Sequence, residues 1–396
     1  MSRVLYLTNA VSQLMFKEYL KKWKVSPNLS NQNFHNKLIR AIAKFDKVDV
    51  ISIRPINSNF TNKKLPQLVE DEFNISWRYP KVSTSRVAKY LFLNNRIKKV
   101  LPNNEKIEAI LVDTLNMSLL KSAIRIKKSY KCKIIGICTD NPNNISFTSS
   151  SYKNKLIKLG QSLDGYICLT SAISKLYNKA NRPVLQIDGV SEEYESTSKP
   201  LINEQYIYFG GSLMEEYGVY SLIEAYKCIN PKDIKLVLCG HHVNIDKLNS
   251  VIKDNKNIYY LGPVSYENNL NLIKNSLFSI NPRPINPKID EYSIPSKTLE
   301  CISLGVLNIT VNNKLLKEHY DDCIIWAKSS SKEDLIDAIN KALSLSKVEK
   351  DRIIQTAKEK VMERTSLEII GKKIHDLFIV MSKKTPTAVL NRCIPL

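Results

Sequence analysis

One segment organises the rest of the chain: Asp290-Glu-Tyr-Ser-Ile-Pro-Ser-Lys-Thr-Leu-Glu-Cys-Ile-Ser-Leu-Gly-Val-Leu-Asn-Ile-Thr310. It begins as a polar loop with Pro295 and continues as a short helical pattern that ends at Gly305. An apolar strand, 306–311, follows. Ser296 can cap this helix, and its first backbone N–H groups and the positive end of its dipole then face the loop. The segment therefore predicts an anion site at the start of a helix.

Two charged side chains lie beside that predicted site. Lys297 and Glu300 are three residues apart, so they share one face of the helix. A phosphate joined to a sugar would use the whole group, because Lys297 and the backbone amides attract the phosphate while Glu300 accepts from two ribose hydroxyls. A capped surface helix with one Lys–Glu pair is the simpler interpretation of the same residues.

The segment resembles a known signature. Pro295-Ser-Lys-x-x-Glu300, followed by a Gly turn and an apolar strand, is similar to the nucleotide-sugar signature of retaining glycosyltransferases of the GT-B fold, family 4. Ile280-Asn-Pro-Arg-Pro284 and the lead-in Glu291-Tyr-Ser resemble the capsule and lipopolysaccharide branch of that family. The resemblance implies an α/β chain of GT-B architecture, with two Rossmann-like domains facing across a cleft.

Alternating strand and helix patterns independently predict parallel sheets covered by helices. The chain of 396 residues is long enough for two cores. We expect an N-terminal acceptor-side domain at 1–190, a polar linker at 191–204 and a nucleotide-sugar-binding domain at 205–365. The resemblance implies that residues 366–396 hold a helix that returns to the first domain, followed by a loose tail.

Glycine positions place the nucleotide in the second half. No glycine precedes Gly136, so the first 135 residues contain neither a GxGxxG fingerprint nor a P-loop. Gly211 and Gly240 follow adjacent predicted strands, where ligands of open α/β sheets bind. Each glycine taken singly also fits a simple turn.

The loop after the first strand of the second half departs from the family pattern. Phe209-Gly-Gly-Ser-Leu-Met-Glu-Glu-Tyr-Gly-Val219 resembles the family's Gly-(Arg)-Leu-x-x-x-Lys-Gly loop, whose cations contact the donor diphosphate. Here Ser212 stands in the Arg place and Tyr217 in the Lys place. A departing diphosphate needs charge stabilisation, so Arg283 and Lys297 are the expected replacements. The predicted nucleotide-sugar-binding residues are Gly211, Ser212, Gly240, Arg283, Glu291, Tyr292, Ser296, Lys297 and Glu300.

Asp113 and Asp140 are the catalytic candidates. Each follows a predicted strand of the first domain, where a loop that could orient an acceptor hydroxyl begins. Both also fit turn or helix-capping aspartates. No Asp-x-Asp occurs, which argues against the metal-dependent transferases of the other common fold. We therefore expect no metal and no cofactor besides the nucleotide-sugar substrate, and the resemblance implies that the donor phosphate helps to take the acceptor proton.

The net charge of +21 predicts an anionic partner. Basic runs occur at 121–133, at 86–99 and around Trp23, the second interleaved with aromatic and apolar residues. Such a surface suits anionic lipid headgroups, and the enzymes that it resembles use polyprenyl-linked acceptors at the inner face of the membrane. A solvated basic face is the simpler interpretation, and no recognition motif supports nucleic acid.

Cysteine usage and the N-terminus predict a cytoplasmic location. The eight scattered cysteines show no ligand spacing, and the N-terminal residues predict a strand rather than a signal peptide. The combined expectation is a retaining, metal-independent glycosyltransferase of bacterial surface polysaccharide biosynthesis. It would move a sugar from a nucleotide sugar to a lipid-linked or oligosaccharide acceptor, peripherally at the inner face of the cell membrane. The alternative is a degenerate relative that binds a nucleotide sugar or a partner enzyme without turnover.

Overall fold

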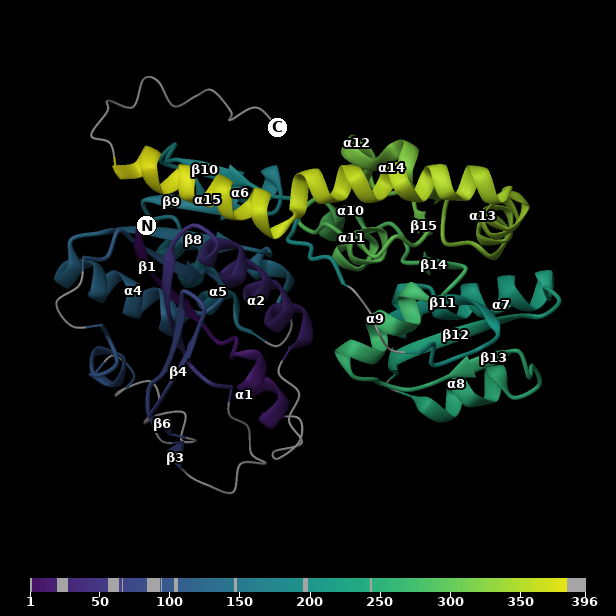
Figure 1. Ribbon diagram of the computed structural model, residues 1–396, viewed down its shortest axis with the longest axis horizontal. Coiled ribbons are helices and arrows are strands. Elements are labelled where there is room, and N and C mark those ends of the chain that lie inside the picture. Colours follow the sequence, from purple (N-terminus) through teal and green to yellow (C-terminus); the bar gives the residue numbers. More distant parts are fainter. Residues whose placement is uncertain are drawn as a thin grey trace. The chain divides into compact units, whose positions relative to one another are not determined.

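The computed structural model describes residues 2–19, 28–55, 64–65, 67–83, 93, 95–102, 106–145, 148–194, 199–242 and 244–382. The chain divides into two compact units (Figure 1). Unit 1 comprises Met1–Val190 and Arg364–Leu396, and unit 2 comprises Ser191–Glu363. Each unit is built on a mainly or wholly parallel sheet with helices between its strands, which confirms the predicted α/β fold class.

The described sheet of unit 1 has eight strands in the order β10-β9-β8-β7-β1-β2-β5-β4. All neighbours are parallel except β4 and β5 at one edge. The central strands β7 and β8 are mostly buried apolar runs, as expected for a sheet covered on both faces. The strands are β1 (Arg3–Thr8), β2 (Lys47–Ser52), β4 (Leu68–Glu72), β5 (Ile75–Tyr79), β7 (Ala109–Asp113), β8 (Lys133–Cys138), β9 (Gly165–Cys168) and β10 (Val184–Gln186), with β3 (Lys64–Leu65) and β6 (Val82–Ser83) as a separate antiparallel pair.

Helices of unit 1 include one from the far end of the chain. They are α1 (Gln13–Glu18), α2 (Leu29–Ala43), α4 (Met117–Tyr130), α5 (Ser150–Gly160), α6 (Ser171–Tyr177) and α15 (Leu367–Ser382). α15, yellow in Figure 1, packs against α2. Its buried Ile374, Leu377 and Phe378 belong to the same apolar core as Leu38 of α2. The C-terminal helix is therefore part of the folded core of unit 1.

Unit 2 contains a described sheet of six parallel strands in the order β13-β12-β11-β14-β15-β16. The strands are β11 (Gln205–Ser212), β12 (Ile234–His241), β13 (Ile258–Tyr260), β14 (Phe278–Asn281), β15 (Asn308–Val311) and β16 (Ile325–Ala327). The helices are α7 (Val219–Ile229), α8 (Ile245–Ile252), α9 (Tyr266–Lys274), α10 (Pro287–Asp290), α11 (Ser296–Ser303), α12 (Lys314–Tyr320), α13 (Lys332–Ser344) and α14 (Lys347–Thr365). In the described part of the chain, no helix is long and apolar enough to cross a bilayer.

Candidate functional site

The strand order of unit 2 reverses between β11 and β14. Chain order runs from β11 outward to β13 on one side and from β14 outward to β16 on the other. Open parallel sheets bind ligands beyond the carboxyl ends of the strands at such a reversal. There, Gly211 and Ser212 end β11, and Asn281 ends β14. The predicted glycine and serine of the donor site thus lie at the position that this topology favours for a ligand.

Lys297 lies over the carboxyl end of β11. Its Nζ donates to the carbonyl oxygen of Gly210 at 3.1 Å. Gly211 has a φ of +141°, and a Cβ there would overlap the Lys297 ammonium. A Cβ on Gly240, at the adjacent end of β12, would overlap the carbonyl oxygen of Gly211 in the same way. Both glycines therefore permit close approach, and Gly211 makes room for the cation.

A buried chain of polar side chains anchors α11 to the sheet. The Thr298 hydroxyl lies 3.1 Å from the Thr310 hydroxyl, which donates to Asn308 Oδ1 at 2.6 Å. Asn281 Nδ2 donates to Thr298 Oγ1 at 3.4 Å, so β14, β15 and α11 share one network. Because Lys297 precedes Thr298 directly, this network fixes the turn of α11 that carries the cation.

The N-terminus of α11 has no side-chain cap. Its N-cap residue is Pro295, whose carbonyl oxygen accepts from the Thr298 N–H at 3.0 Å. The prediction that Ser296 caps the helix is therefore wrong, since Ser296 is the first helical residue and is exposed. Proline at the cap position has no side-chain acceptor to offer the helix N–H groups. The first N–H groups remain available to an anion, which is the condition that the predicted site requires.

Glu300 is held by a tyrosine that the sequence did not indicate. It lies one turn into α11, and the phenol of Tyr266, the first residue of α9, donates to its Oε1 at 2.9 Å. Both residues are half-buried. The Lys297 residue is exposed overall, but protein atoms surround its ammonium. This local desolvation lowers the pKa of Lys297, and the nearby Glu300 carboxylate partly opposes that shift.

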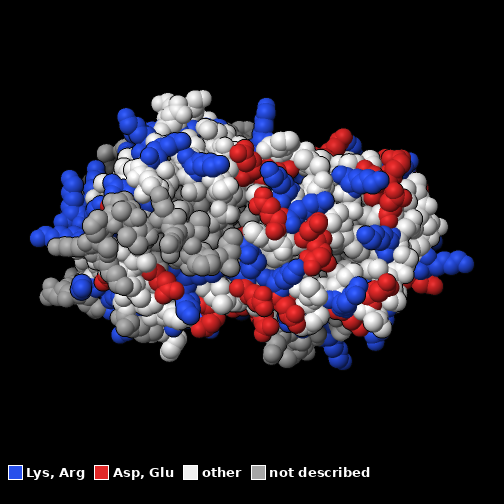
Figure 2. Space-filling model, turned by 90° about the horizontal axis from the view of Figure 1, so that it is seen from above, with Lys and Arg blue, Asp and Glu red and all other residues white. Residues whose placement is uncertain are grey.

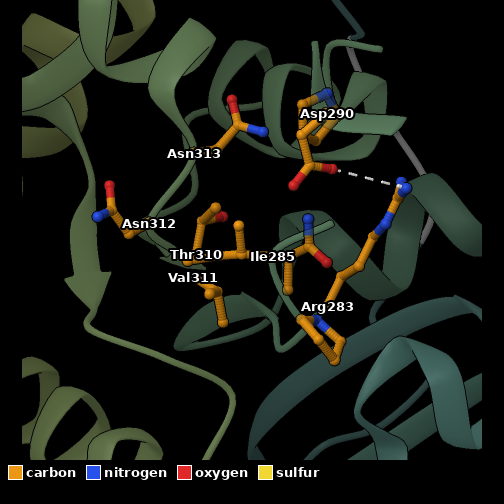
Figure 3. A pocket seen from close by; sticks show the side chains of 10 residues that line it. Arg283, Ile285, Asp290, Thr310, Val311, Asn312 and Asn313 are labelled. Carbon is orange, nitrogen blue, oxygen red and sulfur yellow. Dashed lines mark ion pairs between the residues drawn. The ribbon is translucent and has the colours of Figure 1, made fainter. Parts of the chain in front are cut away.

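Arg283 supplies a second cation on the loop after β14. Its guanidinium carbon lies 5.5 Å from the centroid of the Tyr217 ring, a cation–π distance. Its Nη2 lies 3.7 Å from Asp290 Oδ1, as the dashed line in Figure 3 shows. Tyr217 ends a 3₁₀ turn, Glu215–Tyr217, that follows β11. The structure therefore brings Arg283 to the segment after β11 that contains Tyr217.

A pocket beside this ion pair lies at the carboxyl ends of β14 and β15 (Figure 3). It is lined by Asn281, Arg283, Pro284, Ile285, Asp290, Pro295, Thr310, Val311, Asn312 and Asn313. Amides, a hydroxyl and one ion pair can donate and accept hydrogen bonds to a ligand that is rich in hydroxyls. Glu291 and Tyr292 lie directly after α10 on the loop that leads to α11, with Glu291 exposed and Tyr292 half-buried.

The two catalytic candidates of unit 1 differ in burial. Asp113 at the end of β7 is 2% exposed, accepts from the Leu115 N–H at 2.9 Å and lies 3.7 Å from His35 Nε2. Such burial argues against direct contact with an acceptor and favours the turn role. Asp140, after β8, is exposed. Among the described residues, no three His, Cys, Asp or Glu side chains lie together as a metal site would require.

An asparagine pair marks the strand reversal of unit 1, between β1 and β7. Asn116 Nδ2 donates to Asn9 Oδ1 at 3.2 Å, and the Asn116 side chain also caps α4. Both residues are half-buried. The sequence suggested no pairing, because the two residues are far apart along the chain and each alone is an ordinary loop or cap residue.

Exposed cations cover two adjacent helices of unit 1, α4 and α5. Neither helix contains an acidic residue. The basic surface consists of Arg125, Lys128, Lys131, Lys133, Lys155 and Lys158. Figure 2 shows Lys and Arg side chains along the left edge, on the side where Figure 1 places α4. The predicted basic residues at 20–27 and 84–92 lie outside the described residues.

Unit 2 resembles a known protein family, and the whole chain resembles several solved structures. Residues 192–360 match the family model of glycosyl transferases group 1. No curated protein matches the chain significantly. Sucrose-phosphate synthase from Thermosynechococcus elongatus superposes with a TM-score of 0.68 at 10% identity, covering 96% of this chain and 99% of its own.

Two further solved structures with a similar fold contain a bound UDP sugar or UDP. The E. coli trehalose-6-phosphate structure bound with UDP-2-fluoro glucose has a TM-score of 0.68 at 11% identity, covering 95% of this chain and 99% of its own. Anabaena HepE in complex with UDP and glucose has a TM-score of 0.66 at 10% identity, covering 96% and 100%. At these identities the likeness shows the shared fold. The group 1 domain and that fold together identify the chain as a glycosyltransferase of the GT-B fold.

Proposed function

We propose that this glycosyltransferase is a retaining enzyme of family 4, in its capsule and lipopolysaccharide branch. It would take a sugar from a nucleotide sugar, without a metal ion, and pass it to a lipid-linked glycan at the inner face of the cell membrane. One observation carries the donor assignment. Lys297 lies over the strand end at the sheet reversal, and Glu300 is on the same helix.

The donor would bind at the carboxyl end of the unit 2 sheet. Lys297, Arg283 and the uncapped N-terminus of α11 supply positive charge for the diphosphate. Glu300, one turn into the same helix, would accept from the ribose hydroxyls. UDP in the descriptions of two similar folds makes a uridine nucleotide the first to test.

The transfer requires stabilisation of the leaving group. The bond between the anomeric carbon and the phosphate oxygen breaks, and the nucleoside diphosphate keeps the electron pair. The acceptor hydroxyl oxygen bonds to the same face of the anomeric carbon, and its proton passes to the departing phosphate oxygen. Lys297 and Arg283 neutralise the negative charge that grows on the diphosphate, which a divalent metal would otherwise do. Activity should therefore survive chelation with EDTA.

The acceptor would bind unit 1, where Asn9, Asn116 and the exposed Asp140 are among the polar residues that follow the strands. The basic surface on α4 and α5 would hold unit 1 against anionic lipid headgroups, because each nearby Lys or Arg contributes about 1 kcal/mol of attraction. A lipid-linked acceptor would then be presented to a protein that is already at the membrane.

Nucleotide binding and turnover together test the proposal. UDP, GDP, ADP and CMP are added separately while thermal unfolding is followed. The correct nucleotide at 100 times its Kd should stabilise the wild type by about 2.7 kcal/mol. Glu300→Ala should lose that shift, and Glu318→Ala, at an exposed position on α12, should keep it.

Turnover separates the enzyme from a degenerate binder. Release of the nucleoside diphosphate from the matching nucleotide sugar, with an α-linked product from an α-linked donor by NMR, supports the retaining enzyme. Binding without release under any acceptor condition would mean that the cations absent at Ser212 and Tyr217 are not replaced, and it would overturn the proposed transfer.

A further inference from the structure

The phenol of Tyr266 contacts Glu300 in the proposed donor site, but the proposed function gives it no role. Ser265 caps α9 by accepting from the Asn268 N–H at 3.1 Å, which fixes the direction in which the helix starts. Tyr266 follows as the first helical residue and reaches Glu300 Oε1 at 2.9 Å. The contact joins α9 to α11 across 34 residues of sequence.

A carboxylate that binds a ribose needs a fixed orientation. The terminal torsion of glutamate is broad, so a carboxylate without a partner samples many planes. Two vicinal hydroxyls can both donate to one carboxylate only when its plane faces them. A phenol donor at 2.9 Å restricts that plane, and hydrogen bonds to a charged acceptor are stronger than neutral ones.

The carboxylate of Glu300 also lies near the charge of Lys297 on the same helix. The two charges attract each other, as the effect of Glu300 on the Lys297 pKa shows. A carboxylate released from Tyr266 could turn toward the ammonium. Its plane would then no longer face the ribose, which would lose its acceptor.

We propose that Tyr266 is a positioning residue that holds Glu300 toward the ribose, so that the donor site selects ribonucleotides over 2′-deoxyribonucleotides. The proposal rests on the proposed function and deepens it by naming the part of the nucleotide that is discriminated. Tyr266 acts through Glu300 and is not assigned any contact with the reacting atoms.

The test measures affinity for UDP, GDP and ADP and for the 2′-deoxy form of each, by titration calorimetry with the full chain. We expect the wild type to bind one ribonucleotide about tenfold or more tightly than its deoxy form, the range of one hydrogen bond to a charged group. Tyr266→Phe should weaken binding of that ribonucleotide and lower the preference at least threefold. Its affinity for the deoxy form should stay within about twofold of the wild type.

A matched control is available on β13. Tyr259 donates to Glu204 Oε1 at 3.2 Å, so Tyr259→Phe removes the same kind of phenol–carboxylate bond elsewhere in unit 2. This control should keep the full preference. Glu300→Asp provides a second variant in case Tyr266→Phe folds poorly. It withdraws the carboxylate from Tyr266 by one methylene and should also lose the preference for the ribonucleotide.

The possible outcomes distinguish failure of the positioning role of Tyr266 from failure of the proposed glycosyltransferase function. The positioning role is overturned if Tyr266→Phe keeps the wild-type preference for the ribonucleotide. It is also overturned if the variant loses affinity equally for the ribonucleotide and its deoxy form. Nucleotide binding itself stands in both cases. Equal wild-type affinity for both forms removes the ribose role of Glu300 and the inference with it. No nucleotide binding at all overturns the proposed function and this inference together.

Discussion

At the scale of single residues, the proposed donor site depends on how the Lys297 ammonium is held. Lys297 donates to the Gly210 carbonyl, and Gly211 lacks the Cβ that would displace it. Protein atoms around the ammonium lower its pKa below that of an ordinary lysine. In the proposed site, an ammonium that is already desolvated would lose little further solvation on binding a phosphate.

This shift predicts a pH dependence. Lys297 is charged below its lowered pKa and neutral above it, so affinity for a nucleoside diphosphate should be full at lower pH and fall as the pH rises through that value. Lys297→Arg stays charged and should hold its affinity to about pH 10. Titration calorimetry of both proteins with one nucleotide separates Lys297 from the ligand's own titration. Parallel pH profiles for the two proteins would contradict the assignment.

Stability should respond to the same proton with the opposite trend. Between the lowered pKa and the ordinary value, the unfolded chain binds more protons at this lysine than the folded chain. The contribution of Lys297 to the free energy of unfolding therefore rises with pH over that window. Comparing urea unfolding of the wild type and Lys297→Met across the window would show this slope. A wild-type slope equal to that of the variant would exclude it.

At the scale of elements, tertiary contacts determine the positions of two helices, α11 and α15. α11 is tied into the sheet by Thr298, Thr310 and Asn308, which fixes the direction in which Lys297 leaves the helix. α15 completes unit 1, with Gly371 positioned where a Cβ would overlap the carbonyl oxygen of Ala41 on α2. Both helices are therefore defined by what they pack against.

The role of α15 predicts a strong contrast between neighbouring substitutions. Leu377 is 3% exposed in the core of unit 1, whereas Ile379 on the same helix is 40% exposed. Leu377→Ala should lower the free energy of unfolding of unit 1 by about 2–5 kcal/mol, through lost burial and the cavity left behind. Ile379→Ala should change it by less than about 1 kcal/mol. Urea denaturation measures both, and equal effects would mean that α15 is only loosely attached.

At the scale of the whole molecule, charge is distributed unevenly. The chain carries a net charge of +21, and in unit 1 the exposed cations of α4 and α5 are not interrupted by an acid on either helix. Lys127 on α4 pairs with Asp164 at 2.7 Å, so it contributes to packing rather than to the basic surface. The proposed contact with an anionic bilayer would use this surface.

Binding to lipid vesicles tests the proposed contact between the basic surface and an anionic bilayer. The protein should sediment with vesicles of phosphatidylglycerol and phosphatidylcholine, but not with phosphatidylcholine alone, and less so as salt increases. Lys128→Glu combined with Lys155→Glu should weaken this binding about tenfold or more. Lys347→Glu combined with Lys350→Glu, which makes the same change in net charge on α14, should leave it nearly unchanged. Equal losses would show that only total charge matters, and tighter binding to duplex DNA than to vesicles would favour nucleic acid.

Parts of the fold were missed where local signals conflicted. The hairpin of β4 and β5 was not predicted, since Glu70, Asp71 and Glu72 obscure the strand pattern of β4. The turn itself had a signal, because Asn74 adopts a φ of +56° and asparagine tolerates that conformation. The strand β16 was not predicted either.

Local sequence was sufficient for the alternating strands and helices, for the cation and carboxylate on one face of α11, and for glycines at the ends of β11 and β12. These features depend on spacing within a few residues, which periodicity and turn chemistry report directly. Only the tertiary structure shows that Tyr266 contacts Glu300, that Arg283 lies over the Tyr217 ring and that Asp113 is buried. Such contacts join residues tens of positions apart, and only the parallel sheet, by gathering strand ends at one edge, brings them together.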